Sequence, residues 1–257
     1  MLVVAHPDDD AYGVAGSVAL HDADPRFRYV LVHATVGEAG ETAPDFPATQ
    51  EPLAVVRRRE CEAAWRAHGR VPDRHEWLGL PDGRVAEMPE DELVATIARI
   101  MAEERPDVVA TFGPDGITGH PDHVAVGAAT DAAFHRLRDS GEPGLLRLVH
   151  GALPQSVFER WNAARVQRGM WPYDPSAVYH VRGVPDEQIG VVVDTSAVAD
   201  RVVRGLMEHR SQRHVIAGGI DGADRWSRIV ARENLVLAWP PREAGDPVLT
   251  DIFEGLD

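Results

Sequence analysis

The alternation of short apolar runs with amphipathic segments restricts the fold of this 257-residue chain more than any other feature. Runs typical of buried strands and segments with helical apolar spacing follow one another at 2–4, 14–20, 27–35, 52–68, 75–80, 89–104, 107–112 and 121–138. Strands separated by helices form parallel sheets with right-handed crossovers. The first half therefore predicts a parallel α/β arrangement.

The second half is less regular. We expect strands near 147–152, 177–182 and 189–194, helices at about 198–210 and 224–238, and a loosely packed tail after Pro240-Pro241. No internal repeat, low-complexity tract or linker interrupts the sequence. The predicted fold class is α/β: a Rossmann-like, mostly parallel sheet flanked by helices, forming a single domain over residues 1–257.

Composition excludes several classes of partner. The 41 acidic residues outnumber the 26 lysines and arginines, for a net charge of −15 with neutral histidines, which argues against nucleic acid or an anionic membrane. The single cysteine, Cys61, rules out an intrachain disulfide framework and is expected on the buried face of a helix. No signal peptide or membrane-spanning run is evident, so we expect a cytoplasmic protein. Whether copies of the chain form a homo-oligomer is left open.

Two segments rich in histidine and aspartate stand where strands are expected to end. Residues 5–10 (Ala-His-Pro-Asp-Asp-Asp) follow the first apolar run, and residues 119–123 (Gly-His-Pro-Asp-His) follow the run 108–112. Each alone reads as a capped turn that opens a helix. Together, at the carboxyl ends of parallel strands where α/β proteins bind ligands, they favour two halves of one metal site.

The donor types of these segments suit hydrolysis. His6 and Asp9 lie three apart and can reach one ion, and one of His120 and His123 can complete an N₂O set of the kind that catalytic zinc uses. Asp8, placed between two ligands, is a natural general base. The other histidine of the second segment can donate to a developing oxyanion. Amide hydrolysis uses all of these groups.

Together these motifs resemble the LmbE-like, or PIG-L, N-deacetylase family. The matching stretches are Ala5 to Asp9 with His120 to His123, Thr35 to Glu41, Arg57 to Glu60 with Asp82-Gly83, and His209 to Gln212. The resemblance covers most of residues 1–135 and a patch near 210. It implies a Rossmann-like zinc hydrolase that removes an acetyl group from N-acetylglucosamine units, as in precursors of mycothiol and phosphatidylinositol.

The resemblance also implies roles for single residues. His6, Asp9 and His123 would hold Zn²⁺ or another divalent metal, and Asp8 would be the general base. His120, oriented by Asp122, would serve the oxyanion and the departing amine.

Arg57 and Asp82 would contact substrate hydroxyls at the rim of the sheet, outside the metal centre. The alternative for these two is a surface ion pair, either with each other or with Glu60.

Two positions depart from the family pattern. Asp10 replaces a usual glutamate, a change expected to matter little. Thr118 replaces a tyrosine found in the mycothiol branch, so oxyanion stabilisation would fall to zinc and His120. For His209 and Gln212, expected on the helix 198–210, two readings stay open: support of the site, or hydrogen bonding to helix-end carbonyls.

The predicted function is zinc-dependent removal of an acyl group, acetyl in the family, from the amine of an N-acetylglucosamine-type sugar or related small conjugate. One alternative is an iron(II) oxygenase, whose two-histidine, one-carboxylate ligand set is of the same kind. Another is a non-catalytic sugar-binding relative, although the ligands and the base are all present.

Overall fold

The computed structural model describes residues 1–214, 223–243 and 245–256. The chain divides into two compact units, one formed by residues 1–85 and 193–233 and the other by residues 86–192 and 234–257. Most strands are parallel and helices flank them, which confirms the predicted α/β class.

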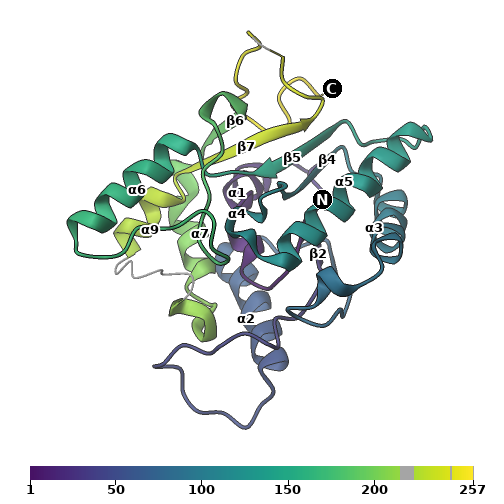
Figure 1. Ribbon diagram of the computed structural model, residues 1–257. Helices are drawn as coiled ribbons and strands as arrows, with labels where there is room; N and C mark the ends of the chain where they lie inside the picture. The colour runs from purple at the N-terminus through teal and green to yellow at the C-terminus, as the bar shows by residue number, and fades with distance from the viewer. Residues whose placement is uncertain (215–222, 244, 257) are drawn as a thin grey trace. The chain divides into compact units, whose positions relative to one another are not determined.

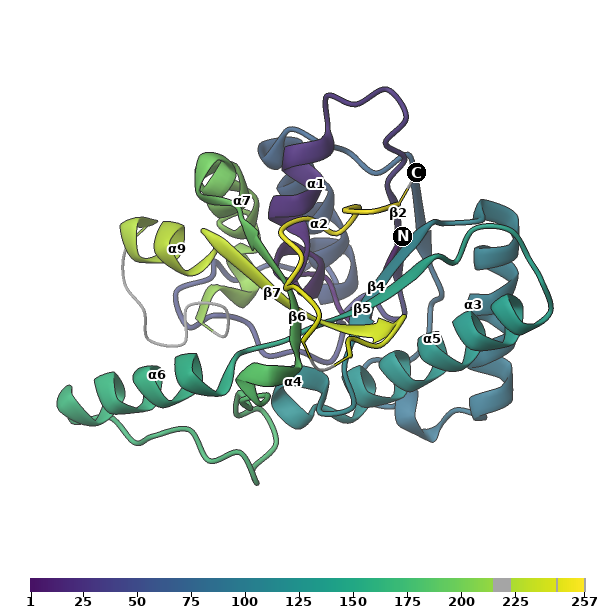
Figure 2. The same ribbon diagram turned by 90° about the horizontal axis from the view of Figure 1, so that it is seen from above.

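The first unit contains β1 (Leu2–Val4), α1 (Ala15–His21), β2 (Val30–His33), α2 (Leu53–His68), β3 (Arg74–Trp77), α7 (Ala199–Leu206) and α9 (Ala223–Ile229) (Figure 1). Its strands pair in parallel in the order β3-β2-β1. Helices α1 and α2 both pack on α7, and Figure 2 shows the three together.

Burial on both faces explains why β1 and β2 read as continuous apolar runs. Every residue of the two strands is buried, and the register places Leu2 opposite Leu31 and Val4 opposite His33. Because the strands are parallel, their carboxyl ends lie at one edge, where residues 5–10 and 34–41 follow them.

The buried face of α2 is partly polar. Val56, Cys61 and Ala64 are buried as the spacing predicts, but Arg57 and Glu60 lie on the same face and are buried too. Buried charged side chains persist only where they find partners. Both belong to the polar network described below.

The second unit contains α3 (Glu90–Glu104), β4 (Val108–Phe112), α4 (Gly116–Gly119), α5 (Pro121–Asp139), β5 (Arg147–Gly151) and α6 (Gln155–Gln167), with most of β6 (Ile189–Asp194) and β7 (Arg232–Trp239). Its strands follow the order β4-β5-β7-β6; β4 and β5 are parallel, and β7 runs antiparallel to β5. Helices α3 and α5 pack side by side (Figures 1 and 2).

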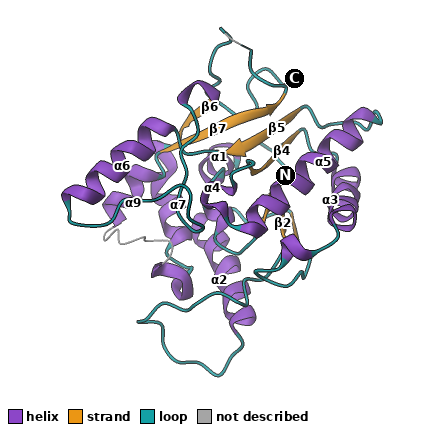
Figure 3. Cartoon of the chain, viewed as in Figure 1, coloured by secondary structure: helices purple, strands orange, loops and turns teal. Residues whose placement is uncertain are grey.

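Several expectations for the second half were wrong. Residues 177–182 form no strand, because the backbone at Tyr179 adopts φ 67°, which interrupts an extended chain. The helix expected at 224–238 is short, and its second half is strand β7 (Figure 3). Helix α7 ends at Leu206 rather than near residue 210, and α6 was not foreseen.

The tail is also anchored rather than loosely packed. The Arg147 guanidinium donates to the carbonyl oxygens of Ile252 (2.6 Å) and Glu254 (2.8 Å), and the Ile252 side chain is buried. In the described ranges, no helix has both the length and the apolar composition needed to cross a bilayer.

Candidate active site

The first of the two histidine- and aspartate-rich motifs, residues 5–10, begins where β1 ends. A short 3₁₀ turn, Asp9–Ala11, follows it, and Asp8 takes up φ 107°, a region that residues other than glycine rarely adopt. The Asp8 amide donates to Asp10 Oδ1 (3.0 Å), and the His6 amide donates to Asp9 Oδ2 (2.8 Å). The turn therefore fixes three successive carboxylates in different directions.

The His6 ring lies between two carboxylates. Its Nε2 is 3.0 Å from Asp82 Oδ1, and its Nδ1 is 3.3 Å from Asp9 Oδ2. If Nε2–H donates to Asp82, the Nδ1 lone pair faces an oxygen lone pair of Asp9, which favours a cation between them. Neighbouring ligands of tetrahedral zinc lie roughly 3.3 Å apart, given bonds of about 2.0–2.1 Å. His6 and Asp9 therefore fit a metal site, with Asp82 orienting the ring.

This contact corrects the expected position of Asp82. The side chain is only 7% exposed and touches His6 directly, so it does not lie outside the candidate metal centre. Its other oxygen accepts the Ala39 amide (2.8 Å). Burial opposes ionisation of Asp82, but the hydrogen bond and charge of His6 outweigh it and lower the pKa of the carboxyl group.

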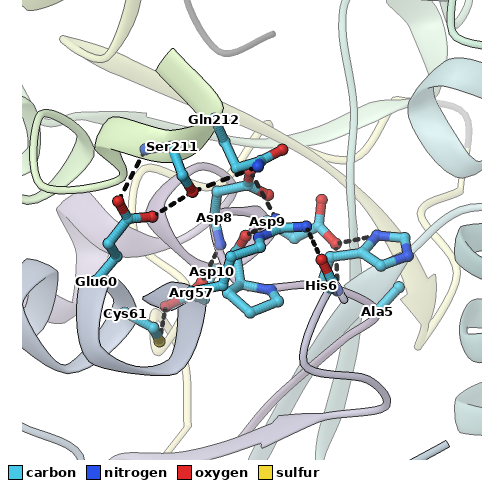
Figure 4. A network of polar contacts seen from close by, with 12 residues as sticks. Ala5, His6, Asp8, Asp9, Asp10, Arg57, Glu60, Cys61, Ser211 and Gln212 are labelled. Atoms are coloured by element: carbon cyan, nitrogen blue, oxygen red, sulfur yellow. Dashed lines mark hydrogen bonds and ion pairs between the residues drawn. The ribbon is translucent and has the colours of Figure 1, made fainter. Parts of the chain in front are cut away.

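Arg57 holds the Asp8 carboxylate (Figure 4). Its guanidinium donates to Asp8 Oδ2 (3.1 Å) and to the carbonyl oxygens of Pro7 (2.5 Å) and Gly37 (2.9 Å). The backbone at Gly37 adopts φ 70°, and a β-carbon there would overlap the guanidinium where it now lies, so glycine suits this position. Burial raises the pKa of Asp8 to about 7 and the charge of Arg57 only partly opposes it, a value suited to a general base.

The expected alternative for Arg57, a surface ion pair with Asp82 or Glu60, is wrong. The residue is 4% exposed, and its carboxylate partner is Asp8. Glu60 instead accepts the Ser211 amide (2.8 Å) and hydroxyl (2.6 Å), as Figure 4 shows.

Asp10, which stands where the family usually has glutamate, is the centre of a buried network. Besides the Asp8 amide, its fully buried carboxylate accepts from His33 Nε2 (3.1 Å), Trp65 Nε1 (2.5 Å) and the Cys61 thiol (3.6 Å). Burial would raise its pKa, but the His33 contact outweighs burial and the net shift is downward. His33 Nδ1 in turn lies 2.9 Å from His75 Nε2.

His33, Cys61 and His75 also place their donor atoms within 4.8 Å of one another, as a metal site would. Each of these three side chains already hydrogen-bonds within this network. Burial raises the pKa of the Cys61 thiol well above its usual value, which disfavours the thiolate that a metal would bind. We therefore interpret the cluster as support for the turn at Asp8.

The segment that follows α7 secures the loop after β2. Gln212 Nε2 donates to the Glu41 carbonyl (3.1 Å), and the Ala43 amide donates to the Ser211 carbonyl (2.7 Å). His209 is fully buried, and neither of its ring nitrogens hydrogen-bonds to any residue that the structure describes. The interpretation of His209 as a partner of helix-end carbonyls is therefore wrong.

The second of these motifs, residues 119–123, leads into α5 in the other unit. His123 Nδ1 lies 3.0 Å from the Gly116 carbonyl, and its ring stacks between those of Phe112 (4.2 Å between centroids) and His120 (4.8 Å). Because a carbonyl oxygen only accepts, Nδ1 carries the hydrogen and Nε2 carries the lone pair. His123 thus has the tautomer that a metal ligand needs.

His120 has the opposite tautomer. Its Nδ1 accepts the amide hydrogen of Asp122 (3.1 Å), so the neutral ring carries its hydrogen on Nε2. That hydrogen suits donation to an oxyanion. The Asp122 side chain is fully buried, and its main chain orients His120.

The predicted site residues fall into two groups. The first unit brings together His6, Asp8, Asp9, Arg57 and Asp82, and the second brings together His120, Asp122 and His123. Sequence reasoning missed Asp10, His33 and Trp65 as supports of the turn. The sequence contained a signal for His33, which is the one polar residue at the end of an apolar strand.

The α/β fold and the histidines and carboxylates at its strand ends define a Rossmann-like hydrolase. The chain belongs to the family described as GlcNAc-PI de-N-acetylase (PIG-L), whose sequence profile matches residues 1–134. This confirms the predicted family and the predicted enzyme class, an N-deacetylase.

Similar proteins agree with this assignment. The 1D-myo-inositol 2-acetamido-2-deoxy-alpha-D-glucopyranoside deacetylase 2 of Saccharopolyspora erythraea is 31% identical over 295 residues, covering 100% of both chains. Among solved structures, a conserved protein of Thermus thermophilus matches with a TM-score of 0.63 at 22% identity, covering 95% of each chain. The N,N'-diacetylchitobiose deacetylase of Pyrococcus horikoshii matches at 0.58 and 20%, covering 92% of this chain and 82% of that one. These two structures support the fold.

Proposed function

We propose that this protein hydrolyses the N-acetyl group of a 2-acetamido-2-deoxyglucoside, using a divalent cation, zinc by preference, held by His6, Asp9 and His123. The observation that carries the proposal is the His6 ring, whose Nδ1 faces Asp9 at 3.3 Å while Asp82 holds Nε2. The tautomer of His123 supports the third ligand. The relative from Saccharopolyspora erythraea is named for such a glucoside, which supports the substrate class.

The cation, when bound, would lower the pKa of a water molecule toward about 7 and polarise the acyl carbonyl. Asp8 accepts the proton of the attacking water, and Arg57 keeps its carboxylate in place. His120 donates a hydrogen bond from Nε2 to the oxyanion as the carbonyl carbon becomes tetrahedral. The proton on Asp8 then passes to the departing amine, so the products are acetate and a free amino sugar.

A substrate screen tests this proposal. Zinc-loaded protein is incubated with N-acetylglucosamine, its glycosides and a simple acetamide, and both amine and acetate are measured. We expect equal amounts of the two products from at least one sugar, with far less from the acetamide. Absence of amine from every sugar, with folded and metal-loaded protein, would refute the proposal, and metal-dependent oxygen uptake would support the oxygenase instead.

A further inference from the structure

Arg182 is a partly buried cation whose side chain forms no ion pair or hydrogen bond within residues 1–214, 223–243 and 245–256. Its Nε is shielded from solvent and has no partner there. The Nε atoms of Arg57 and Arg147 also lack a partner there, but their other guanidinium nitrogens donate to Asp8 and to the Ile252 carbonyl. A shielded N–H donor without an acceptor is unfavourable, so the side chain of Arg182 suggests a site for an external acceptor.

The guanidinium lies beside the second motif. The Arg182 amide donates to the Ile117 carbonyl (2.8 Å), which ties the segment 177–182 to α4. Gly119 makes room for the guanidinium, because a β-carbon at that position would overlap it. Gly119 immediately precedes His120, so the unpaired charge lies next to the histidine to which we assign the oxyanion.

Tyr179 lies on the same segment and contacts His120. Its amide donates to the Thr118 carbonyl (2.9 Å), and its ring meets the His120 ring edge-on, 5.1 Å between centroids at 78°. Although in contact with His120, the residue is 70% exposed, which leaves its phenol accessible. Tyr179 (φ 67°) and Ile117 (φ 64°) both adopt backbone conformations that are costly without glycine, and such strain concentrates at functional sites.

We propose that Arg182 and Tyr179 form an anion-binding subsite beside His120, which recognises a carboxylate or phosphate group on the substrate. The inference rests on the N-deacetylase function proposed above and adds a substrate class to it: acidic N-acetyl amino sugars. A guanidinium binds both anions through paired N–H groups, and a phenol adds one further donor.

Binding of inorganic phosphate to the zinc-loaded protein tests the subsite without any need for turnover. Titration calorimetry should show affinity at least tenfold weaker in Arg182→Gln, since a neutral amide cannot replace the charged hydrogen bonds of the guanidinium. Arg182→Lys should recover part of the affinity. Arg168→Gln, an exposed arginine at the end of α6, is the matched control and should bind as the wild type does. Equal affinity in Arg182→Gln, with an unchanged melting temperature, would overturn the subsite.

Kinetics distinguish the two anions. The values of kcat/KM are compared for N-acetylglucosamine, its 6-phosphate and N-acetylmuramic acid, which carries a carboxylate. We expect one acidic sugar to be favoured over the neutral one, and Arg182→Gln to reduce that preference about tenfold; the sugar affected identifies the anion. A preference that survives Arg182→Gln contradicts the proposal.

The two experiments also separate two kinds of failure. If no sugar is hydrolysed but phosphate binding depends on Arg182, the proposed reaction is wrong and the anion subsite stands. If sugars are hydrolysed while phosphate binding ignores Arg182, the reaction stands and the subsite is wrong.

Discussion

Asp8 has a strained backbone, and its carboxyl group is subject to two opposing effects: burial raises the pKa, and the charge of Arg57 lowers it. Residues held in sparsely populated regions cost roughly 1–3 kcal/mol, and Asp8 keeps φ 107° because Asp10 accepts its amide and Arg57 binds its side chain. The Arg57 contact comes from a helix far along the chain. The surrounding structure therefore stabilises a conformation that the sequence alone would not favour, and its effect is to fix where the carboxylate lies.

Replacement of Asp8 by asparagine tests its role as general base. Asn keeps the size of the side chain and an oxygen for Arg57, but it cannot accept the proton of the attacking water. We expect kcat to fall about 10²–10⁴-fold while zinc content stays at the wild-type level. Amine release and metal analysis of the same sample measure the two effects.

The control for this variant is Asp91→Asn, an exposed carboxylate on α3, which should change neither quantity. If Asp8→Asn emptied the metal site yet regained full activity with added zinc, Asp8 would be a ligand and not the base.

At the scale of elements, the sequence predicts best where local pattern and tertiary burial agree. The strands at 2–4 and 108–112 and the helices α2, α3 and α5 have apolar spacing that matches their buried faces. Segment 232–239 reads as part of a helix, and its pairing with β5 on one side and β6 on the other makes it a strand. The segment 177–182 reads as a strand, but the positive φ of Tyr179 (67°) interrupts the extended backbone.

A buried contact between α2 and α1 makes the stability of the protein depend on pH. His68, the last residue of α2, is 2% exposed, and its Nε2 hydrogen-bonds to the Ala15 carbonyl (2.9 Å). Burial lowers its pKa from 6.5 to about 4. The unfolded chain therefore takes up a proton below pH 6.5 that the folded chain resists until about pH 4. The unfolding free energy is therefore unaffected by protonation of His68 above pH 6.5 and decreases as pH falls toward 4. The decrease is about 2 kcal/mol at pH 5.

Urea denaturation of His68→Gln measures this contribution. Glutamine can still donate to the Ala15 carbonyl but does not titrate, so the loss of unfolding free energy between pH 7.5 and pH 5 should be about 2 kcal/mol smaller than in the wild type. His214→Gln, an exposed histidine, should leave the loss unchanged. A wild-type pH dependence in His68→Gln would mean that other groups control acid sensitivity.

Across the chain, the residues proposed to hold one cation stand far apart in the sequence: His6 and Asp9 follow β1, and His123 lies in α5. The sequence predicted these residues from their types and their positions after strands. It could not predict which ring nitrogen each histidine presents to the cation. The tautomer of His6 depends on Asp82, which is far away in the sequence, and that of His123 depends on how the chain folds at the Gly116 carbonyl. Nor could it reveal the network around Asp10, which depends on three separate elements.

The proposal of a single shared ion makes a quantitative demand on metal binding. Dialysis against a chelator should abolish hydrolysis, and titration with Zn²⁺ should restore it at one ion per chain. His6→Ala and His123→Ala should each weaken zinc binding strongly, and the double variant should be little worse than either one, because both remove ligands of the same ion. Zinc should also raise the melting temperature of the wild type, since a ligand that binds only the folded chain stabilises it. Two ions per chain, each lost in only one of the variants, would show that the two motifs bind metal separately.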